Sequence, residues 1–290
     1  MQITFIGFGE AARAFTDTLG ADQQGLTLAA FDILDTPEMA AAMASRRVRQ
    51  GTSPADAVAG ADWVICAVTA DQSLKAARSV LDHLVQGQVY IDINSVSPGR
   101  KVSTAEALEA RGVGYLDMAV MAPVHPHGHR TPVLLAGRSA CDLAAPLQEV
   151  GFVLDLIGDL PGEATAIKMV RSVFVKGLEA ITVECALAAS AAGVHDRVFA
   201  SLERSYPNID WPTHLAHSFE RTLRHGTRRA AEMRESGATL DEMGLVGALA
   251  VQTAEVQARM GALPLIDLPQ GDLPAAITEV AALRGAKPRR

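Results

Sequence analysis

Apolar residues up to about position 160 fall into short runs that alternate with stretches of helical periodicity. Short apolar and β-branched runs predict strands, and an apolar repeat of three to four residues predicts helices. The predicted strands are 2–6, 26–31, 63–68, 89–93, 114–120 and 133–136, and the predicted helices are 10–19, 72–84 and 98–111. This alternation is typical of βαβ units, so we predict an α/β domain with a mainly parallel sheet.

The pattern changes after Pro161-Gly162. Residues 163–192 are almost continuously compatible with a helix, which would be about 45 Å long if unbroken. Further helical segments follow, among them 213–235, and we find no convincing strand pattern there. We therefore predict an α/β domain at 1–161 and an all-α C-terminal domain at 162–290, with a polar, frayed end at 285–290.

A glycine-rich turn stands between the first predicted strand and helix, with the sequence Gly7-Phe8-Gly9-Glu10-Ala11-Ala12. The first glycine permits a tight turn, the second lets the backbone approach a pyrophosphate, and the alanine is small enough for close packing of helix on strand. The helix N-terminus offers free N–H groups and the positive end of its dipole to the phosphates. We therefore predict that 1–161 is a Rossmann domain and that residues 7–12 bind a dinucleotide.

Asp32 follows the second predicted strand. A carboxylate at this place accepts hydrogen bonds from the ribose hydroxyls of NAD and repels the extra phosphate of NADP. The predicted cofactor is therefore NAD, with NADP less favoured, and Asp35 is a second candidate for the same role. The alternative is an ordinary βα turn with Asp32 as a loop residue.

Composition and charge narrow the functional classes. The chain has 290 residues, of which 49% are hydrophobic, and a net charge of −7, so it can form a sizeable core and lacks the basic balance of a general nucleic-acid binder. Its three cysteines, Cys66, Cys141 and Cys185, have no metal-ligand spacing and are expected to be buried, reduced thiols. We find no signal-peptide pattern and no apolar run long enough for a membrane span, so we expect a soluble, cytoplasmic protein.

The long predicted helix is apolar on most sides but carries one polar stripe, roughly 140° wide. The stripe consists of Lys168, Arg171, Ser172, Lys176 and Glu179. It faces either a cleft beside the first domain or solvent, where Lys176 and Glu179 would pair.

The predicted helix 213–235 has a polar face of its own, formed by His214, His217, Arg221, His225, Arg228 and Glu232. A histidine-rich polar face of this kind is typical of a solvated surface. Arg228, Arg229 and His225 together would also suit a clamp for a carboxylate or phosphate. The helix pattern leaves both interpretations open.

Three histidines, His125, His127 and His129, lie in a loop that is rich in proline and glycine. Such a composition is typical of a rigid loop, which we interpret as shaping a substrate pocket. A surface loop and a metal site are the alternatives. The spacing indicates no further metal ligand, so we predict no metal.

Five motifs give the chain a resemblance to a known family. They are Ile6-Gly7-Phe8-Gly9, Asp92-Ile93-Asn94-Ser95-Val96-Ser97-Pro98, Tyr115-Leu116-Asp117-Met118-Ala119-Val120, Gly162 with Lys168-Met169-Val170-Arg171-Ser172, and His225-Gly226 with Arg228-Arg229 and Glu232-Met233. Over nearly its whole length the chain resembles the β-hydroxyacid dehydrogenase superfamily, which includes 3-hydroxyisobutyrate and 6-phosphogluconate dehydrogenases. It is most similar to a phosphogluconate-dehydrogenase-like branch.

The resemblance implies roles for individual residues. Lys168 falls where the family has its catalytic lysine, a general acid and base. Cofactor contacts are implied for Val68, Thr69, Asn94 and Ser95, and substrate contacts for Ser97, Met121, Ala122, Pro123, Arg171, Ser172, His225 and Arg228. Met121-Ala122-Pro123 stands where the family has Ser-Gly-Gly, and Ser172 stands where it has asparagine, so we expect a different substrate.

The leading hypothesis is an NAD(P)-dependent oxidoreductase that transfers hydride between the cofactor and a small hydroxy acid or its keto or semialdehyde form. The alternatives are imine-reductase-type reduction of C=N bonds on the same scaffold and a non-catalytic NAD-binding sensor. The expected partners are a small anionic substrate and further copies of the chain, in a homodimer or higher oligomer. We expect neither nucleic acid nor membrane as a partner.

Overall fold

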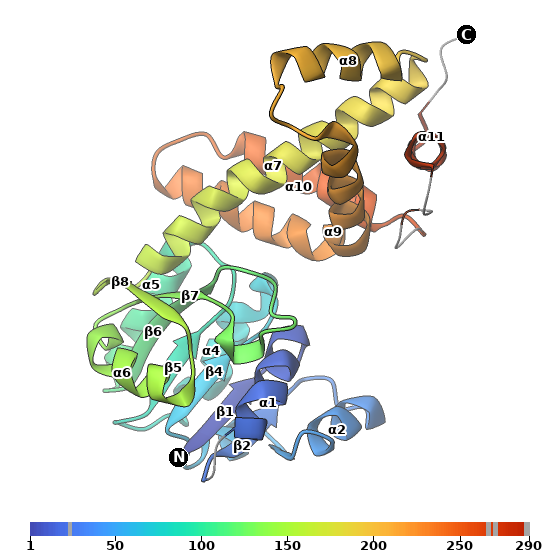
Figure 1. Cartoon of the computed structure of the whole chain (residues 1–290). Helices are drawn as coiled ribbons and strands as arrows, with labels where there is room; N and C mark the ends of the chain where they lie inside the picture. Colours follow the sequence, from blue (N-terminus) through green and yellow to red (C-terminus); the bar gives the residue numbers. More distant parts are fainter. Residues whose placement is uncertain (23–24, 265–267, 269–271, 287–290) are drawn as a thin grey trace. The chain divides into compact units, whose positions relative to one another are not determined.

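The computed structural model describes residues 1–22, 25–264, 268 and 272–286 (Figure 1). The chain divides into two compact units, Met1–Met169 and Val170–Arg290. The division falls inside the long helix α7 (Glu163–Ala191), whereas the sequence predicted it before this helix, at 161/162. The first turn of α7 is hydrogen-bonded to a strand of unit 1, which explains the later division. Of the end predicted to be frayed, 287–290 lie outside the described residues.

Unit 1 is built on a sheet of eight strands in the order β3-β2-β1-β4-β5-β6-β7-β8. The strands are β1 (Gln2–Ile6), β2 (Thr27–Phe31), β3 (Val48–Gln50), β4 (Trp63–Cys66), β5 (Val89–Asp92), β6 (Gly114–Val120), β7 (Val133–Ala136) and β8 (Leu154–Gly158). All neighbours are parallel except β6 and β7. The predicted α/β domain with a mainly parallel sheet is confirmed.

Helices cover both faces of this sheet, because successive strand residues point to opposite sides. In β4, Trp63 and Ile65 join one core cluster, while Val64 and Cys66 join the other. The connecting helices are α1 (Glu10–Asp22), α2 (Pro37–Ala44), α3 (Pro54–Val58), η1 (Ala70–Gln72), α4 (Ser73–Leu81), α5 (Pro98–Glu109), η2 (Gly128–Arg130) and α6 (Ala140–Val150). The first cluster takes side chains from α1, α2 and α6, and the second takes them from α3, α4 and α5.

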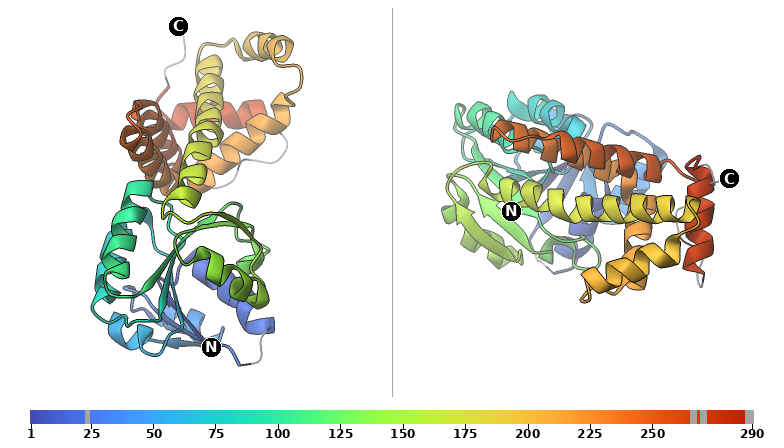
Figure 2. Two further views of the ribbon diagram at one scale, coloured as in Figure 1. Left: turned by 90° about the vertical axis from the view of Figure 1, so that its left-hand side faces the viewer. Right: turned by 90° about the horizontal axis from the view of Figure 1, so that it is seen from above.

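Unit 2 contains α7 beyond Met169, α8 (His195–Ser205), α9 (Trp211–Glu242), α10 (Ala248–Gly261) and α11 (Leu273–Leu283). Its described residues hold no strand, so the predicted all-α C-terminal domain is confirmed. In Figure 2 the long α7 is coloured yellow. Gly226 of α9 lies against the backbone of Gly261 in α10, so a side chain at either position would force these helices apart.

The structure bears on the expectations about membrane spans and about the cysteines. Within the described ranges, no helix is long and apolar enough to cross a membrane. The three cysteines form no disulfide, and Cys66 is buried as expected, but Cys141 is exposed on the surface of α6 and Cys185 is half-buried. Burial raises the pKa of the Cys66 thiol to about 12, so it stays protonated at neutral pH.

Candidate functional site

The carboxyl ends of five parallel strands meet at one edge of the unit 1 sheet. β2, β1, β4, β5 and β6 are consecutive neighbours and run in the same direction. The segments that leave this edge begin at Asp32, Gly7, Ala67, Ile93 and Met121. Ligands of open α/β sheets bind at this edge. It holds the predicted cofactor residues and the predicted substrate loop 121–123.

The two glycines of the turn after β1 have different roles. Gly7 is required by the fold, and Gly9 leaves open space beside the backbone. Gly7 has φ of +90°, and a Cβ there would lie 2.5 Å from the carbonyl oxygen of Ala67 and 2.5 Å from Cγ1 of Val68. Gly9 is exposed, and a Cβ there would meet no atom within 4 Å. Ala12 is buried in the core, so α1 packs closely on the sheet. Glu10 is exposed in the first turn of α1 and adds a negative charge beside the expected phosphates.

Asp32 is tied to this turn through its carboxylate. Its Oδ2 accepts a hydrogen bond of 2.6 Å from the backbone nitrogen of Phe8, and its Oδ1 accepts one of 2.9 Å from the nitrogen of Leu34. Each oxygen retains a further lone pair for a ligand hydroxyl. Asp35 is exposed and accepts a hydrogen bond of 3.4 Å from Gln50. Asp32 is therefore the acidic residue that is hydrogen-bonded to the turn.

Asn94 joins the segments after β4 and β5. Its Oδ1 accepts a hydrogen bond of 2.7 Å from the backbone nitrogen of Val68, and its Nδ2 donates to Oδ1 of Asp92 over 2.7 Å. The side chain is buried. Asn94 thus shapes the loop at the edge where the resemblance implies a cofactor contact. Thr69 is exposed and Ser95 half-buried at the same edge.

Helix α7 begins beside this edge. A Cβ at Gly162, which has φ of +97°, would lie 3.1 Å from the carbonyl oxygen of Pro98 and 3.2 Å from its Cβ, so the backbone before α7 lies on the first residue of α5. Ser97 is buried at the N-cap of α5. Lys168 is half-buried within the second turn of α7, still inside unit 1. The segment that carries Lys168 is therefore anchored next to the loop that follows β5.

The predicted substrate loop also contacts the start of α7. Met121 is half-buried and packs against a small cluster that includes Ala164 of α7. Its backbone nitrogen donates a hydrogen bond of 3.0 Å to the carbonyl oxygen of Pro132. Ala122 and Pro123 are exposed and have no polar side-chain atom. The loop therefore presents backbone and apolar side chains at the place where the resemblance implies Ser-Gly-Gly.

Of the three histidines in the loop, one is buried and two are exposed. His129 is buried, its Nδ1 lies 2.7 Å from Oγ1 of Thr18 on α1, and its ring stands edge-on to Phe152. His125 and His127 are exposed. No group of three or more potential metal-ligating residues occurs among the described residues. His129 therefore acts as a structural link to α1.

In unit 2 the polar stripe of α7 is buried against α9 from Ser172 onward. Nζ of Lys176 lies 2.5 Å from Oε2 of Glu232 and donates to Oγ of Ser172 over 3.3 Å. Burial lowers the pKa of Lys176, and the nearby Glu232 opposes this shift. The interpretation as a solvent-facing stripe closed by a Lys176–Glu179 pair is therefore wrong, because Lys176 is buried and pairs with a residue of another helix.

Glu179 forms a second ion pair between the same two helices. Its Oε2 lies 2.6 Å from Nη1 of Arg229, and its Oε1 accepts a hydrogen bond of 2.9 Å from Nη2. Both side chains are buried. The buried pair with Glu179 argues against a part for Arg229 in an anion clamp, which was one of the two interpretations of this helix face. Arg228 and Arg171 are exposed and His225 is half-buried.

Sequence reasoning missed a buried charge cluster in unit 1. Lys101 of α5 lies between Asp92 of β5 and Asp117 of β6, with 3.1 Å from its Nζ to Oδ1 of Asp92 and 3.3 Å to Oδ1 of Asp117. All three side chains are buried. The available signal was a charged residue inside each of three predicted core elements.

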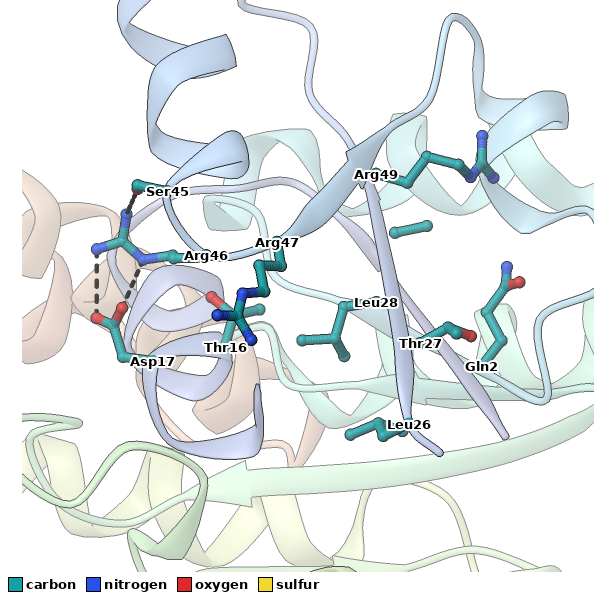
Figure 3. Close-up of a pocket in the computed structure, with 11 residues that line it drawn as sticks. Gln2, Thr16, Asp17, Leu26, Thr27, Leu28, Ser45, Arg46, Arg47 and Arg49 are labelled. Carbon is teal, nitrogen blue, oxygen red and sulfur yellow. Dashed lines mark hydrogen bonds and ion pairs between the residues drawn. The ribbon is translucent and has the colours of Figure 1, made fainter. Parts of the chain in front are cut away.

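A hollow of about 830 Å³ lies away from this edge (Figure 3). Its lining includes Gln2 and Thr27 at the amino ends of β1 and β2, together with Arg46, Arg47 and Arg49. Arg46 is paired with Asp17 of α1. Because nucleotide sites of such sheets lie at the carboxyl ends of the strands, the hollow is not the cofactor site.

Comparison with family profiles gives two matches. Residues 2–140 match the NAD binding domain of 6-phosphogluconate dehydrogenase. Residues 189–260 match a domain of unknown function, DUF1932. The first match covers the glycine-rich turn, Asp32 and the loops at the carboxyl edge of the sheet.

Three solved structures illustrate the likeness. A conserved hypothetical protein from Sinorhizobium meliloti 1021 is 32% identical, with 96% of each chain covered and a TM-score of 0.75. The 3-hydroxyisobutyrate dehydrogenase of Mycobacterium tuberculosis shares the fold at 20% identity, with 96% of this chain and 98% of that chain covered and a TM-score of 0.73. An imine reductase from Bacillus cereus shares it at 20% identity, with 89% and 92% covered and a TM-score of 0.56.

Proposed function

Since this chain belongs to the β-hydroxyacid dehydrogenase superfamily, we propose that it transfers hydride between NAD and a small hydroxy acid or its keto or semialdehyde form. The observation that carries the proposal is the carboxyl edge of the sheet. There the glycine-rich turn, Asp32 and the segment anchoring Lys168 belong to one compact unit.

The residues at this edge fit a dinucleotide. The open space at Gly9 and the first amides of α1 suit a pyrophosphate, and Gly7 supplies the tight turn beneath it. Phe8 and Leu34 orient the carboxylate of Asp32. This carboxylate would accept hydrogen bonds from the ribose hydroxyls of NAD and would repel the 2′-phosphate of NADP. These features support NAD over NADP as the cofactor.

Lys168 is the proposed general acid and base. A nicotinamide bound at this edge would supply or accept the hydride. During oxidation the ε-amino group of Lys168 accepts the proton of the substrate hydroxyl, and during reduction it returns that proton to the carbonyl oxygen. The anchoring of α7 next to the loop after β5 supports this role.

The proposed substrate carries an anionic group. Arg171 and Arg228 are exposed cations, and His225 is half-buried nearby in sequence. Ser172 retains a hydroxyl where the family has an amide, and the loop 121–123 offers no hydroxyl. Both differences support a substrate unlike those of the named dehydrogenases.

Reduction of C=N bonds is the second candidate, favoured by the shared fold of an imine reductase. A panel of small keto acids, semialdehydes and cyclic imines, assayed for oxidation of NADH and NADPH, separates the candidates. Turnover of keto acids or semialdehydes supports the proposal, and turnover of imines alone replaces it with C=N reduction. Tight NAD binding without turnover of any compound indicates a sensor and contradicts the enzyme.

We propose further that the chain forms a homodimer or higher oligomer through unit 2. An apolar hollow of about 350 Å³ is lined by α7 together with Leu240 and Leu249. Phe174 on this helix exposes 73% of its surface, and Ile181 exposes 63%. Exposed apolar surface of this kind is typical of protein–protein contacts, and a second copy of the chain would cover it.

A further inference from the structure

Lys101 is a fully buried ammonium group shared by three elements of unit 1. Its Nζ donates a hydrogen bond of 2.7 Å to the carbonyl oxygen of Asp92, and it lies 3.1 Å from Oδ1 of the same residue. Asp117 contributes Oδ1 at 3.3 Å. The side chain thus joins α5 to β5 and β6 in the interior of the unit.

A charged group at this place is costly unless its partners hold it. Taking the ammonium and two carboxylates out of water carries a large desolvation penalty, and apolar residues of similar volume often stabilise a core equally well. Burial opposes the charge on Lys101, but Asp92 and Asp117 together raise its pKa above the ordinary value. The lysine therefore remains charged. We interpret its role as orienting the side chains of Asp92 and Asp117.

One end of the cluster holds the start of α7. Oδ2 of Asp117 accepts hydrogen bonds from the backbone nitrogens of Gly162, at 3.1 Å, and Thr165, at 2.9 Å. The first amides of a helix have no partner inside the helix, and a carboxylate there also interacts well with the helix dipole. Asp117 therefore fixes where α7 begins, and Lys168 lies three residues beyond Thr165.

The other end of the cluster holds the loops that follow β4 and β5. Oδ1 of Asp92 accepts hydrogen bonds from the backbone nitrogen of Asn94, at 2.9 Å, and from its Nδ2, at 2.7 Å. Asn94 in turn accepts from the backbone nitrogen of Val68. Tyr115 donates to Oδ2 of Asp92 over 3.1 Å. An unbroken series of contacts thus runs from Val68 through Lys101 to Thr165.

We infer that Lys101 is a positioning residue, which fixes the first turn of α7, and with it Lys168, relative to the loops that follow β4 and β5. The inference rests on the proposed function in one respect, since Lys168 must take part in the reaction for its position to matter. The contacts by which the cluster fixes the start of α7 do not depend on any activity.

Lys101→Met tests the inference, because methionine keeps the unbranched chain and removes the charge. The matched control is Arg111→Met, which removes an arginine whose ion pair with Asp82 lies at the surface. We expect Lys101→Met to bind NAD within about threefold of the parent, with KM similarly conserved, and to lose about tenfold or more in kcat. Amide exchange at Gly162 and Thr165 should accelerate while exchange in β1 and β4 is unchanged. Unchanged kcat and unchanged exchange at these two amides would overturn the inference.

A double-mutant cycle with Lys168→Met separates positioning from general stability. If Lys101 acts through Lys168, the loss from Lys101→Met should largely disappear in the Lys168→Met background. Full, independent losses in both backgrounds contradict the inference. Undiminished turnover by Lys168→Met alone sinks the proposed function instead, and the exchange measurement still decides whether Lys101 holds α7.

Two further measurements apply if Lys101→Met does not fold. Lys101→Met/Asp117→Asn leaves one fewer unpaired buried carboxylate and keeps an oxygen that can accept from the α7 amides, so we expect it to fold with the same loss in kcat. In the unmodified protein, the amides of Gly162 and Thr165 should exchange as slowly as those of β5 and β6. Rapid exchange at these amides in the folded parent contradicts the inference without any variant.

Discussion

The carboxylate of Asp32 lies 2.6 Å from the backbone nitrogen of Phe8, so the acidic residue after β2 is hydrogen-bonded to the glycine-rich turn after β1. Asp32 therefore has two separable contributions. Its oxygen holds the turn, and we propose that its negative charge disfavours the 2′-phosphate of NADP. A variant that removes the charge and keeps an oxygen to accept from Phe8 distinguishes these contributions.

Asp32→Asn should narrow the preference for NAD over NADP, because the amide oxygen can still accept from Phe8 while the charge is lost. We expect the ratio of the two dissociation constants to fall by about tenfold, measured by titrating each cofactor onto the apo protein. Asp35→Asn is the control and should leave the ratio unchanged. A parent protein that binds NADP more tightly than NAD would remove the role given to Asp32.

The two glycines of the turn should respond differently to alanine. Gly9→Ala adds a methyl group where the protein has open space, so thermal stability should be kept while NAD binding weakens by about tenfold or more. Gly7→Ala forces a clash with Ala67 and Val68, so both stability and binding should fall. Calorimetric Tm and cofactor titration measure the two effects. Unimpaired NAD binding by Gly9→Ala contradicts the placement of the pyrophosphate.

Lys168→Met should cut kcat by about 10²–10⁴-fold and leave NAD binding nearly intact, because general acid–base help is lost while the cofactor residues are untouched. Lys75→Met, at an exposed position on α4, is the control. Steady-state kinetics with the substrate found in the panel provide the measurement. Turnover within a few-fold of the parent would falsify the catalytic assignment.

Arg171→Ala should raise KM by about ten- to a hundredfold if this arginine pairs with an anionic group in the ground state and the transition state alike. Arg224→Ala, an exposed arginine paired with Glu220 on α9, is the matched control and should change KM little. Equal KM values for the parent and Arg171→Ala, or efficient turnover of a neutral substrate only, argue against an anion at this residue.

Phe174→Glu should shift the protein toward monomer, because a charge in the apolar hollow of α7 opposes burial by a second copy. Light scattering at micromolar concentration measures the oligomeric state. Arg204→Glu makes a comparable change on an exposed part of α8 and should have no effect. A parent protein that is monomeric in this experiment contradicts the proposed oligomer.

The sequence predicted elements well where a periodic pattern coincides with a buried face. It missed β8, all of whose residues are exposed or half-buried, and β3, which has three residues and a single apolar side chain. It also ended the helix at 235, whereas α9 continues through Gly237 to Glu242. Gly237 suggested a break, but a Cβ there would lie 3.2 Å from the carbonyl oxygen of Gly247, so the glycine serves a close approach before α10.

The sequence predicted the glycine-rich turn of the candidate site well. It predicted less well the side-chain contacts between separate helices and strands. The glycines and Asp32 lie within one βαβ unit, so local spacing contains the information. The pairs Lys176–Glu232 and Arg229–Glu179 join separate helices, and a stripe on one helix does not reveal what covers it. Lys101 was missed because its partners lie on the strands before and after its helix, and the pattern of each single element does not show which side chains meet in the interior.

The exposed loop at Ala122 and Pro123 has a consequence for redesign of the protein. Both side chains are exposed, and the neighbouring Met121 is held by its backbone and by the cluster around Ala164. Substitutions at 122 and 123 should therefore alter which substrates are accepted at little cost to folding, since surface changes of this kind usually shift stability by no more than about 0.5 kcal/mol. The two positions are a natural starting point for laboratory evolution of new specificities, with the buried Lys101, Asp92 and Asp117 left unmutated.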